Sequence, residues 1–225
     1  MKPSLVSEKT FEDFLGALLD GDMPKCRRIV ETLLEQDVEI ADLYRNLFHR
    51  AQYAIGELWE LNRISVAREH LATSITESLM TLVYPRLFRR ERVGKRAVIS
   101  SGPNEYHQVG GKMVADIFES HGWDGYFLGA NSTEDRLLEE VRKRDPDLLA
   151  FSVALPASVE RLRAMLRRVR TEFPSLPVLI GGKAIADGVE DDFSDVPFVT
   201  VMTTLEELES FLHQGEAHAV HGIRH

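Results

Sequence analysis

A histidine flanked by a carboxylate and by glycines is the group in this sequence best suited to binding chemistry. His107 follows Glu105 by two residues, and Gly110 and Gly111 come three and four residues after it. A loop histidine can offer one ring nitrogen to a metal while a nearby carboxylate accepts the N–H of the other nitrogen. Glycines let a flat ligand approach the backbone closely. The spacing predicts a metal-ligating histidine, although it also fits a loop histidine that is hydrogen-bonded locally.

Motifs for other common chemistries are missing from the sequence. There is no Gly-x-Gly-x-x-Gly dinucleotide fingerprint and no Walker A loop. Nor is there a Gly-x-Ser-x-Gly elbow or a His-Glu-x-x-His zinc site, so no residue set indicates hydrolysis. We therefore expect a binding protein more than an enzyme of these classes.

Charge and cysteine content narrow the functional class further. The 225 residues carry a formal charge of −9, which argues against direct DNA binding because phosphate contacts need a basic face. The single cysteine, Cys26, excludes an intramolecular disulfide framework and fits a reducing compartment. No apolar run approaches the roughly 18 residues of a membrane span, and the first residues lack the apolar core of a signal peptide. A cytoplasmic protein without membrane contact is expected.

The first part of the chain has helical periodicity. Residues 8 to about 90 place apolar side chains at the i, i+3, i+4 and i+7 spacing of helices with one buried face. The pattern predicts four helices, limited by a break at Gly21-Asp22, starts at Pro24 and after Asp37, a turn at Leu61-Asn62-Arg63 and a stop near Pro85. Four short-linked helices form a small bundle, so we expect a helical domain over residues 8–90.

From Lys95 onward, short apolar runs alternate with amphipathic segments. The predicted strands are 97–100, 125–128, 148–152, 178–180 and 198–201, and the predicted helices are 108–120, 133–143, 158–173 and 205–212. This alternation implies a parallel sheet covered on both faces. We expect a Rossmann-like (flavodoxin-like) domain with five parallel strands over residues 95–213, a charged linker over residues 86–94, and a disordered tail with three histidines after His213.

Three strand ends carry motifs that resemble those of a known family. The cobalamin-binding domains share the patterns Asp-x-His-x-x-Gly, Ser-x-Leu or Ser-x-Thr, and Gly-Gly. The corresponding segments here are Glu105-Tyr106-His107-Gln108-Val109-Gly110, Ser152-Val153-Ala154-Leu155 and Gly181-Gly182. The resemblance runs from about residue 96 to 212. The chain departs from the pattern at Glu105, where Asp is usual, and at Ala154, where Leu or Thr is usual.

The resemblance implies a role for each segment. His107 would replace the cofactor's own dimethylbenzimidazole as the lower ligand of cobalt. Ser152 would bond the displaced benzimidazole, and Gly181 and Gly182 would make room for the nucleotide tail. The remaining residues expected to line the cofactor are Glu105, Tyr106, Gln108, Val109, Gly110 and Leu155.

The helical half resembles the cap that precedes cobalamin-binding domains, across about residues 8–88. Nine residues separate Trp59 from Glu69-His70, a pattern typical of photoreceptor regulators that bind adenosylcobalamin. By this resemblance, Trp59 and Val66 would pack beside the 5′-deoxyadenosyl group, Glu69 would hydrogen-bond it, and His70 would line the same pocket. Taken without the cobalamin loop, these residues also fit a core tryptophan and an ordinary Glu–His pair on a helix.

Two departures from the photoreceptor regulators bear on signalling. Glu60 stands where those proteins often have a histidine that captures cobalt after light has expelled the adenosyl group, which leaves His49 and His70 as donors in the cap. The regulators also usually carry an N-terminal DNA-binding helix-turn-helix, whereas this chain begins at the cap. We therefore expect signalling through a protein partner such as a transcription factor, in a chain that could form oligomers.

Four interpretations follow from these resemblances. The favoured one is a sensor that binds adenosylcobalamin, with the benzimidazole displaced and His107 on cobalt, and responds to light or cofactor state by cap movement. The second is a corrinoid protein that carries methyl groups, as methylcobalamin, for a methyltransferase system. The third is a haem-binding sensor on the same fold, and the fourth a fold that has lost its cofactor.

Overall fold

The computed structural model describes residues 4–186, 188, 193 and 195–221, and the side chains of residues 215–221 are not part of that description. The chain divides into two compact units, residues 1–89 and residues 90–225. Each unit has its own core, and each is described by itself. Among the described residues, no helix combines the length and the apolar character needed to cross a bilayer.

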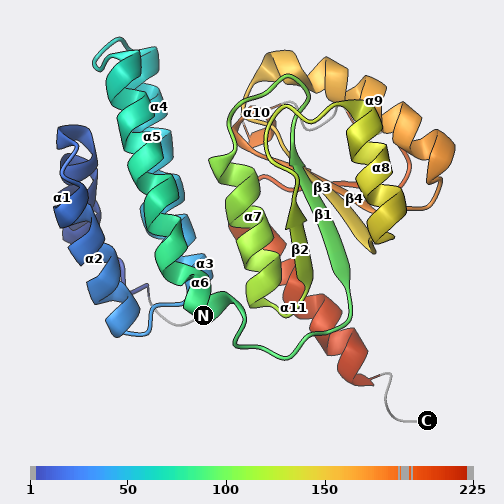
Figure 1. Cartoon of the computed structure of the whole chain (residues 1–225), viewed down its shortest axis with the longest axis horizontal. Helices are drawn as coiled ribbons and strands as arrows, with labels where there is room; N and C mark the ends of the chain where they lie inside the picture. The colour runs from blue at the N-terminus through green and yellow to red at the C-terminus, as the bar shows by residue number, and fades with distance from the viewer. Residues whose placement is uncertain (1–3, 187, 189–192, 194, 222–225) are drawn as a thin grey trace. The chain divides into compact units, whose positions relative to one another are not determined.

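The first unit is built from helices (Figure 1). Its elements are α1 (Glu8–Asp20), α2 (Met23–Glu35), α3 (Ile40–Leu43), the π-helical turn η1 (Tyr44–His49), α4 (Arg50–Glu60), α5 (Val66–Met80), the 3-10 turn η2 (Thr81–Val83) and α6 (Tyr84–Leu87). Ser7, Asp22 and Ser65 cap α1, α2 and α5 through side-chain oxygens that accept from backbone N–H groups. The core of the unit contains fully buried aromatic and aliphatic side chains, among them Phe14, Leu18, Tyr44, Leu47 and Phe48.

The structure corrects the predicted limits of two helices in this unit. The predicted third helix is a continuous run of α3, η1 and α4, with a π-helical turn in its middle. The predicted stop near Pro85 lies two residues before the observed end, because helical structure continues through η2 and α6 to Leu87. Pro85 lies in the first turn of α6, where its missing N–H leaves no intrahelical hydrogen bond unmade.

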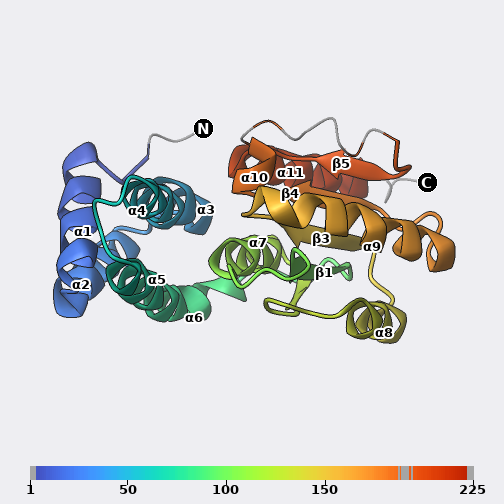
Figure 2. The same ribbon diagram turned by 90° about the horizontal axis from the view of Figure 1, so that it is seen from above.

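The second unit alternates strands and helices (Figure 2). Its elements are β1 (Arg96–Ser101), α7 (Val109–Ser120), β2 (Asp124–Phe127), α8 (Glu134–Arg144), β3 (Leu148–Ser152), the 3-10 turn η3 (Pro156–Ser158), α9 (Val159–Glu172), β4 (Val178–Gly181), α10 (Lys183–Ala186), β5 (Val199–Val201) and α11 (Leu205–His221). All strand pairs are parallel, in the order β2-β1-β3-β4-β5. This is the flavodoxin-like order of an open α/β sheet.

Helices cover both faces of the sheet. Helices α8 and α9 share one hydrophobic core with side chains of β1, β3 and β4, including Val98, Phe151 and Ile180. Helices α7 and α11 contact each other. The predicted fold class, a helical bundle followed by a five-stranded parallel sheet domain, is therefore confirmed.

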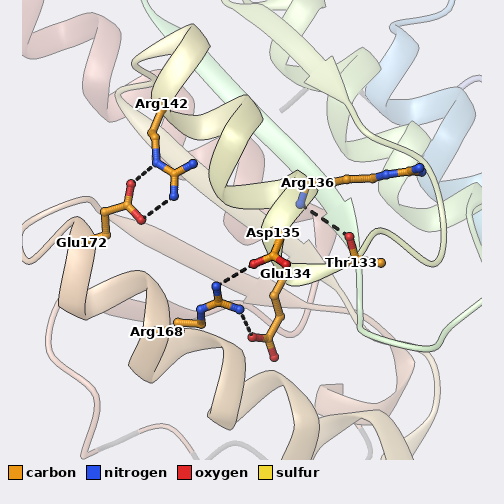
Figure 3. A network of polar contacts seen from close by, with 7 residues as sticks. All are labelled: Thr133, Glu134, Asp135, Arg136, Arg142, Arg168 and Glu172. Atoms are coloured by element: carbon orange, nitrogen blue, oxygen red, sulfur yellow. Dashed lines mark hydrogen bonds and ion pairs between the residues drawn. The ribbon is translucent and has the colours of Figure 1, made fainter.

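Arginine side chains connect α8 to α9 on the surface of the second unit (Figure 3). Arg142 on α8 binds both carboxylate oxygens of Glu172 on α9. Arg168 on α9 donates to Glu134 at 2.9 Å and to Asp135 at 2.6 Å, both in the first turn of α8. The two helices are thus joined by ion pairs at both ends of α8.

Two expectations for this unit need correction. The short helices η3 and α10 were not predicted, because segments of three or four residues carry no readable period. The disordered tail expected after His213 is wrong as far as His221, since α11 continues to that residue. Its last histidine, His225, lies outside the described residues.

Candidate functional site

The candidate site lies at the carboxyl edge of the sheet, where the loops after β1, β3 and β4 meet. Ser152 pairs in register with Ser101 on one side and with Gly181 on the other, so the three strands end at the same level. The backbone N–H of Gly102 donates to the carbonyl of Ser152 at 2.9 Å and ties the first loop to the end of β3. In a doubly wound sheet this edge is the place where ligands bind.

Glu105 is the buried acid of the site. Its side chain is fully buried, and its Oε1 accepts a hydrogen bond of 2.8 Å from the backbone N–H of Ala154 in the loop after β3. Its carbonyl accepts another, of 2.9 Å, from the N–H of Asn131 in the loop after β2. The second carboxylate oxygen, Oε2, is buried and has no hydrogen-bond partner within the described part of the chain. Glu105 therefore joins three loops and keeps an unsatisfied acceptor.

His107 stands next to this carboxylate and faces solvent. Its Nδ1 lies 3.3 Å from Oε1 of Glu105, and 58% of its side chain is exposed. Its carbonyl accepts a hydrogen bond of 2.9 Å from Oγ of Ser101, which holds the residue against the end of β1. A proton on Nδ1 directed at the carboxylate leaves the lone pair on Nε2, the arrangement in which an imidazole binds a metal.

Two glycines let the chain segments at this edge come close together. A β-carbon on Gly110, in the first turn of α7, would lie 2.8 Å from Oγ of Ser152. Gly182 has φ of +113°, and a β-carbon there would lie 2.4 Å from the carbonyl oxygen of Val153. Both distances are far below van der Waals contact. A side chain at position 110 would displace the Ser152 hydroxyl, whereas one at position 182 would displace the backbone at the end of β3.

The other predicted site residues of this unit differ in their exposure. Tyr106 is 76% exposed, and its hydroxyl accepts a hydrogen bond of 3.3 Å from the side chain of Asn131. Gln108 is the residue before α7 and makes no side-chain cap, while Val109 is buried. Leu155 is exposed in the loop after β3. The structure thus brings the predicted loop residues to one edge of the sheet, with Val109 directed into the core.

The predicted residues of the helical unit lie on α4 and α5. Trp59, in the last turn of α4, is 45% exposed, and Val66, at the start of α5, is exposed as well. The reading of Trp59 as a core residue is therefore wrong. Glu69 is largely buried, and its Oε2 lies 3.4 Å from Nε2 of the exposed His70. His49, the other histidine considered as a donor, stacks on Tyr53 with 4.3 Å between ring centroids.

Sequence reasoning missed polar partners in both units. In the sheet unit these are Asn131 and the N–H of Ala154, which contact Glu105 through the backbone. In the helical unit they are Gln52, Thr73 and Thr76, which form hydrogen bonds that reach Glu69. The spacing of four residues between Glu69 and Thr73 was the available signal, since it places both on one face of a helix.

Metal binding by clustered side chains is not indicated. Among the described residues, no group of three or more histidine, cysteine, aspartate or glutamate side chains could hold a metal ion together. His107 is thus a single candidate donor.

Comparison with protein families identifies both units. One model described as a B12 binding domain matches residues 95–208, and a second model with the same description matches residues 10–84. The first covers the sheet unit from β1 to the start of α11, and the second covers most of the helical unit.

The characterised relatives include corrinoid proteins, transcriptional repressors and a methionine synthase. Monomethylamine corrinoid protein 1 of Methanosarcina mazei is 19% identical over 191 residues, which is 81% of this chain and 88% of that protein. The HTH-type transcriptional repressor CarH of Myxococcus xanthus is 30% identical over 132 residues, which is 58% of this chain but 43% of the repressor. The chain therefore spans most of the corrinoid protein and less than half of the repressor.

A solved structure has the same fold. The monomethylamine corrinoid protein of Methanosarcina barkeri superimposes with a TM-score of 0.77 and 15% sequence identity, over 89% of this chain and 95% of that one. At this identity, the likeness concerns the fold alone.

Proposed function

Because the chain belongs to the B12 binding domain family, we propose that it is a sensor that binds adenosylcobalamin and reports light or cofactor state to a protein partner. The observation that carries the proposal is the His107–Glu105 pair, with a half-exposed imidazole against a buried carboxylate at the ligand-binding edge of the sheet. The family matches favour a corrinoid over haem as the ligand of this histidine.

The residues at the sheet edge fit a corrinoid cofactor. His107 would bind cobalt through Nε2, while Glu105 holds Nδ1 and so orients the ring. A carboxylate that accepts the N–H of a metal-binding imidazole raises the basicity of that ligand, and Oε1 of Glu105 is placed to do so. Ser152, Gly181 and Gly182 would contact the nucleotide tail, because Ser152 ends β3 beside β1, and Gly181 and Gly182 lie at the end of β4, the next strand along the sheet. The cofactor would supply a cobalt–carbon bond that light can break.

The helical unit offers residues suited to the upper ligand. Trp59 and Val66 expose apolar surface on the α4–α5 hairpin, which suits packing against a nucleoside. Glu69 would accept a hydrogen bond from the nucleoside, and His70 would line the same surface. Loss of the upper ligand would remove these contacts, so the helical unit would respond to the state of the cofactor. A transcription factor is a suitable partner for such a response.

Reconstitution of a His107→Ala variant tests the cofactor assignment. The wild-type protein should take up adenosylcobalamin in the dark with the spectrum of a histidine-ligated corrinoid. The variant should fold, because the ring is 58% exposed, but should lose that spectrum. His213→Ala is the matched control, since it removes an imidazole from α11 rather than from the loop. Unchanged uptake and spectrum in His107→Ala would refute the assignment.

Illumination tests the sensor assignment. The reconstituted protein should change its absorption spectrum in light, and the change should alter its hydrodynamic size or its binding to a partner. Size and partner binding that remain the same before and after illumination would count against a sensor, while leaving corrinoid binding intact.

Transport of methyl groups is the second candidate, and the match along 81% of the chain to a monomethylamine corrinoid protein favours it. A methyl carrier should prefer methylcobalamin to adenosylcobalamin. Its Trp59→Ala variant should still bind methylcobalamin, because a methyl group is too small to need the indole surface. The sensor should instead lose affinity for adenosylcobalamin on the same substitution.

A further inference from the structure

A line of polar side chains runs through the contact between α4 and α5 in the helical unit. Thr76, on α5, is fully buried, and its Oγ1 donates to the carbonyl of Ala72 at 3.0 Å. The side-chain amide of Gln52, on α4, donates to the same Oγ1 at 2.8 Å. On the other side of the amide, Oγ1 of Thr73 lies 2.9 Å from Oε1 of Gln52. The two helices are thus joined by hydrogen bonds where apolar packing would be the usual contact.

This line ends at the carboxylate of Glu69. Oγ1 of Thr73 lies 2.9 Å from Oε1 of Glu69, one helical turn before it on α5. A hydroxyl has a single proton, so Thr73 can serve only one of the two Oε1 acceptors at a time. The charged carboxylate is the stronger acceptor and holds that proton. Thr73 therefore fixes Oε1 of Glu69 from the inside of the helix pair, and Gln52, held by its own hydrogen bond to Thr76, lies against the Thr73 oxygen.

The other carboxylate oxygen of Glu69 faces an exposed histidine. Oε2 of Glu69 lies 3.4 Å from Nε2 of His70, whose side chain is exposed, whereas 22% of the Glu69 side chain is exposed. Val66 precedes Glu69 by three residues and lies on the same face of α5. This face therefore combines exposed apolar surface with one oriented acceptor, which suits a ligand that has a flat apolar body and a polar donor.

We propose that Gln52 and Thr73 are positioning residues that make Glu69 a selector for the upper ligand of the corrinoid. They hold the carboxylate so that Oε2 accepts a hydrogen bond from a hydroxyl or amino group of a nucleoside. A methyl group has no such donor and gains nothing from the fixed carboxylate. The inference rests on the proposed function and adds the residues that set its ligand selectivity.

Affinity ratios in Thr73 variants test this inference. Dissociation constants for adenosylcobalamin and methylcobalamin are measured in the dark by absorption titration of the full chain. Thr73→Val has the same shape as threonine without the hydroxyl and should lower adenosylcobalamin affinity about tenfold, with methylcobalamin affinity unchanged. Thr73→Ser keeps the hydroxyl and should retain the wild-type ratio. Gln52→Met provides a second variant with the same expected direction, should Thr73→Val fail to fold.

A double-mutant cycle separates positioning from a general effect on the fold. Glu69→Gln should reduce the affinity ratio at least as much as Thr73→Val, because it removes the charged acceptor itself. In the Glu69→Gln background, Thr73→Val should then change the ratio little, since its effect passes through Glu69. Thermal unfolding of each apoprotein shows how much of any change is loss of stability.

The possible outcomes distinguish this inference from the function on which it rests. Failure of the wild-type protein to bind either corrinoid overturns both. Equal affinity of the wild type for the two corrinoids overturns the inference alone, and so does an unchanged ratio in Thr73→Val and Gln52→Met. A parallel loss of both affinities in Thr73→Val overturns it too, because it shows a structural role. A changed ratio that Thr73→Ser restores supports it.

Discussion

At the residue scale, the Glu105 carboxylate is the group that links the loops of the site. It faces His107 at 3.3 Å and accepts from the Ala154 N–H at 2.8 Å, both through Oε1. A carboxylate in this position has two separable roles. One is to accept the backbone hydrogen bond, and the other is to supply negative charge beside the imidazole.

Glu105→Gln separates these roles, because its amide oxygen can still accept from Ala154 while the charge is lost. We expect corrinoid affinity to fall about tenfold to a hundredfold, the usual cost of losing a carboxylate partner of a metal-binding histidine. Spectroscopic titration measures the affinity. Glu105→Asp is the control, since it keeps the charge with a shorter side chain and should bind better than the amide. An amide variant that binds like the wild type would show that the charge is unimportant.

Cys26 provides a second prediction at this scale. The thiol is buried in α2, and burial raises its pKa to about 11. At pH 8 the thiol should therefore be protonated as well as shielded, and the folded protein should react very slowly with a disulfide reagent. Unfolding in guanidinium should release the full equivalent of one thiol at once. Rapid reaction of the folded protein would mean that α2 opens readily.

The pair Glu105 and His107 at the carboxyl edge of the sheet could be found from the sequence, but several contacts of Glu105 could not. The spacing of Glu105 and His107 was enough to suggest a carboxylate beside an imidazole. The partners of Glu105 at Asn131 and Ala154 are backbone groups, and every residue type supplies those. Which N–H comes close depends on how separate loops approach each other, and the linear sequence carries no local sign of it.

At the element scale, Gly182 connects the end of β4 to α10 in a backbone conformation that other residues avoid. Gly182→Ala should lower the free energy of unfolding for two reasons, a φ of +113° and a β-carbon 2.4 Å from the Val153 carbonyl oxygen. Gly188 has φ of +109°, but no atom of the described residues lies within 4 Å of the β-carbon it would gain. Gly188→Ala should therefore cost about 1–3 kcal/mol from backbone strain alone. Gly182→Ala should lower the free energy of unfolding by about 1–3 kcal/mol more than Gly188→Ala, because its β-carbon would also overlap the Val153 carbonyl.

Chemical denaturation of the two alanine variants measures this difference. The pair is matched because the backbone term is nearly the same in both. Equal losses of stability would show that the loop after β3 shifts without cost, and would weaken the idea that Gly182 sets the approach of the two strand ends.

The ion pairs between α8 and α9 give a pH-dependent prediction. The Arg142 side chain hydrogen-bonds Glu172 and lowers the pKa of that carboxyl below its ordinary value of 4.5. A lowered folded-state pKa contributes stability that is complete above the ordinary value and is lost as pH falls through the folded one. Arg142→Met should therefore lower Tm slightly at pH 7 and make no difference well below pH 4.5.

Salt provides the control for this pair. Both side chains are at the surface, so about 1 M salt should screen their interaction and remove the Tm difference between wild type and variant at pH 7. A difference that persists in salt and in acid would indicate lost packing of the arginine stem rather than lost charge.

How well each element was predicted depends on how clearly its sequence pattern marks its ends. The third strand was predicted with its observed bounds of 148–152, because a continuous apolar run between turn residues leaves few alternatives. The end of α11 was missed because the residues after His213, which include Gly215, were expected to form a disordered tail. One glycine costs a helix about 1 kcal/mol, which is too little to end it. The π-helical turn η1 was missed because its residues fit the same apolar spacing as an α-helix.

At the scale of the whole molecule, the division into two units leads to a proteolysis prediction. The units meet at Arg89 and Arg90, which lie in an exposed segment between α6 and β1 without helical or strand structure. Trypsin should cleave there first, because both arginines are accessible and the other described arginines of the units lie largely in helices. Mass spectrometry of a short digest identifies the first cut.

Each product of that cleavage should keep its structure. The helical unit and the sheet unit have separate buried cores, so both fragments should retain their circular dichroism and unfold cooperatively. Early cuts within α8 or α9, or a fragment that loses its helical signal, would contradict the independence of the two units.

The protein family could be predicted from a small part of the sequence. A few residues at three strand ends, in a segment that changes from helical to strand–helix periodicity, led to the family that the two domain models identify. The type within the family was not readable in the same way, because side chains such as Trp59 and Glu69 are ones that any folded bundle could also carry.

The hydrogen bond from Ala154 to Glu105 has a consequence for the evolution of the site. The donor is the peptide group and not the side chain, so this position can drift among nineteen of the twenty amino acids without losing the contact. Only proline lacks the N–H that the buried acid requires. A sequence motif lists side chains only. It would therefore count a substitution at position 154 as a departure from the family pattern, even though the hydrogen bond to Glu105 is kept.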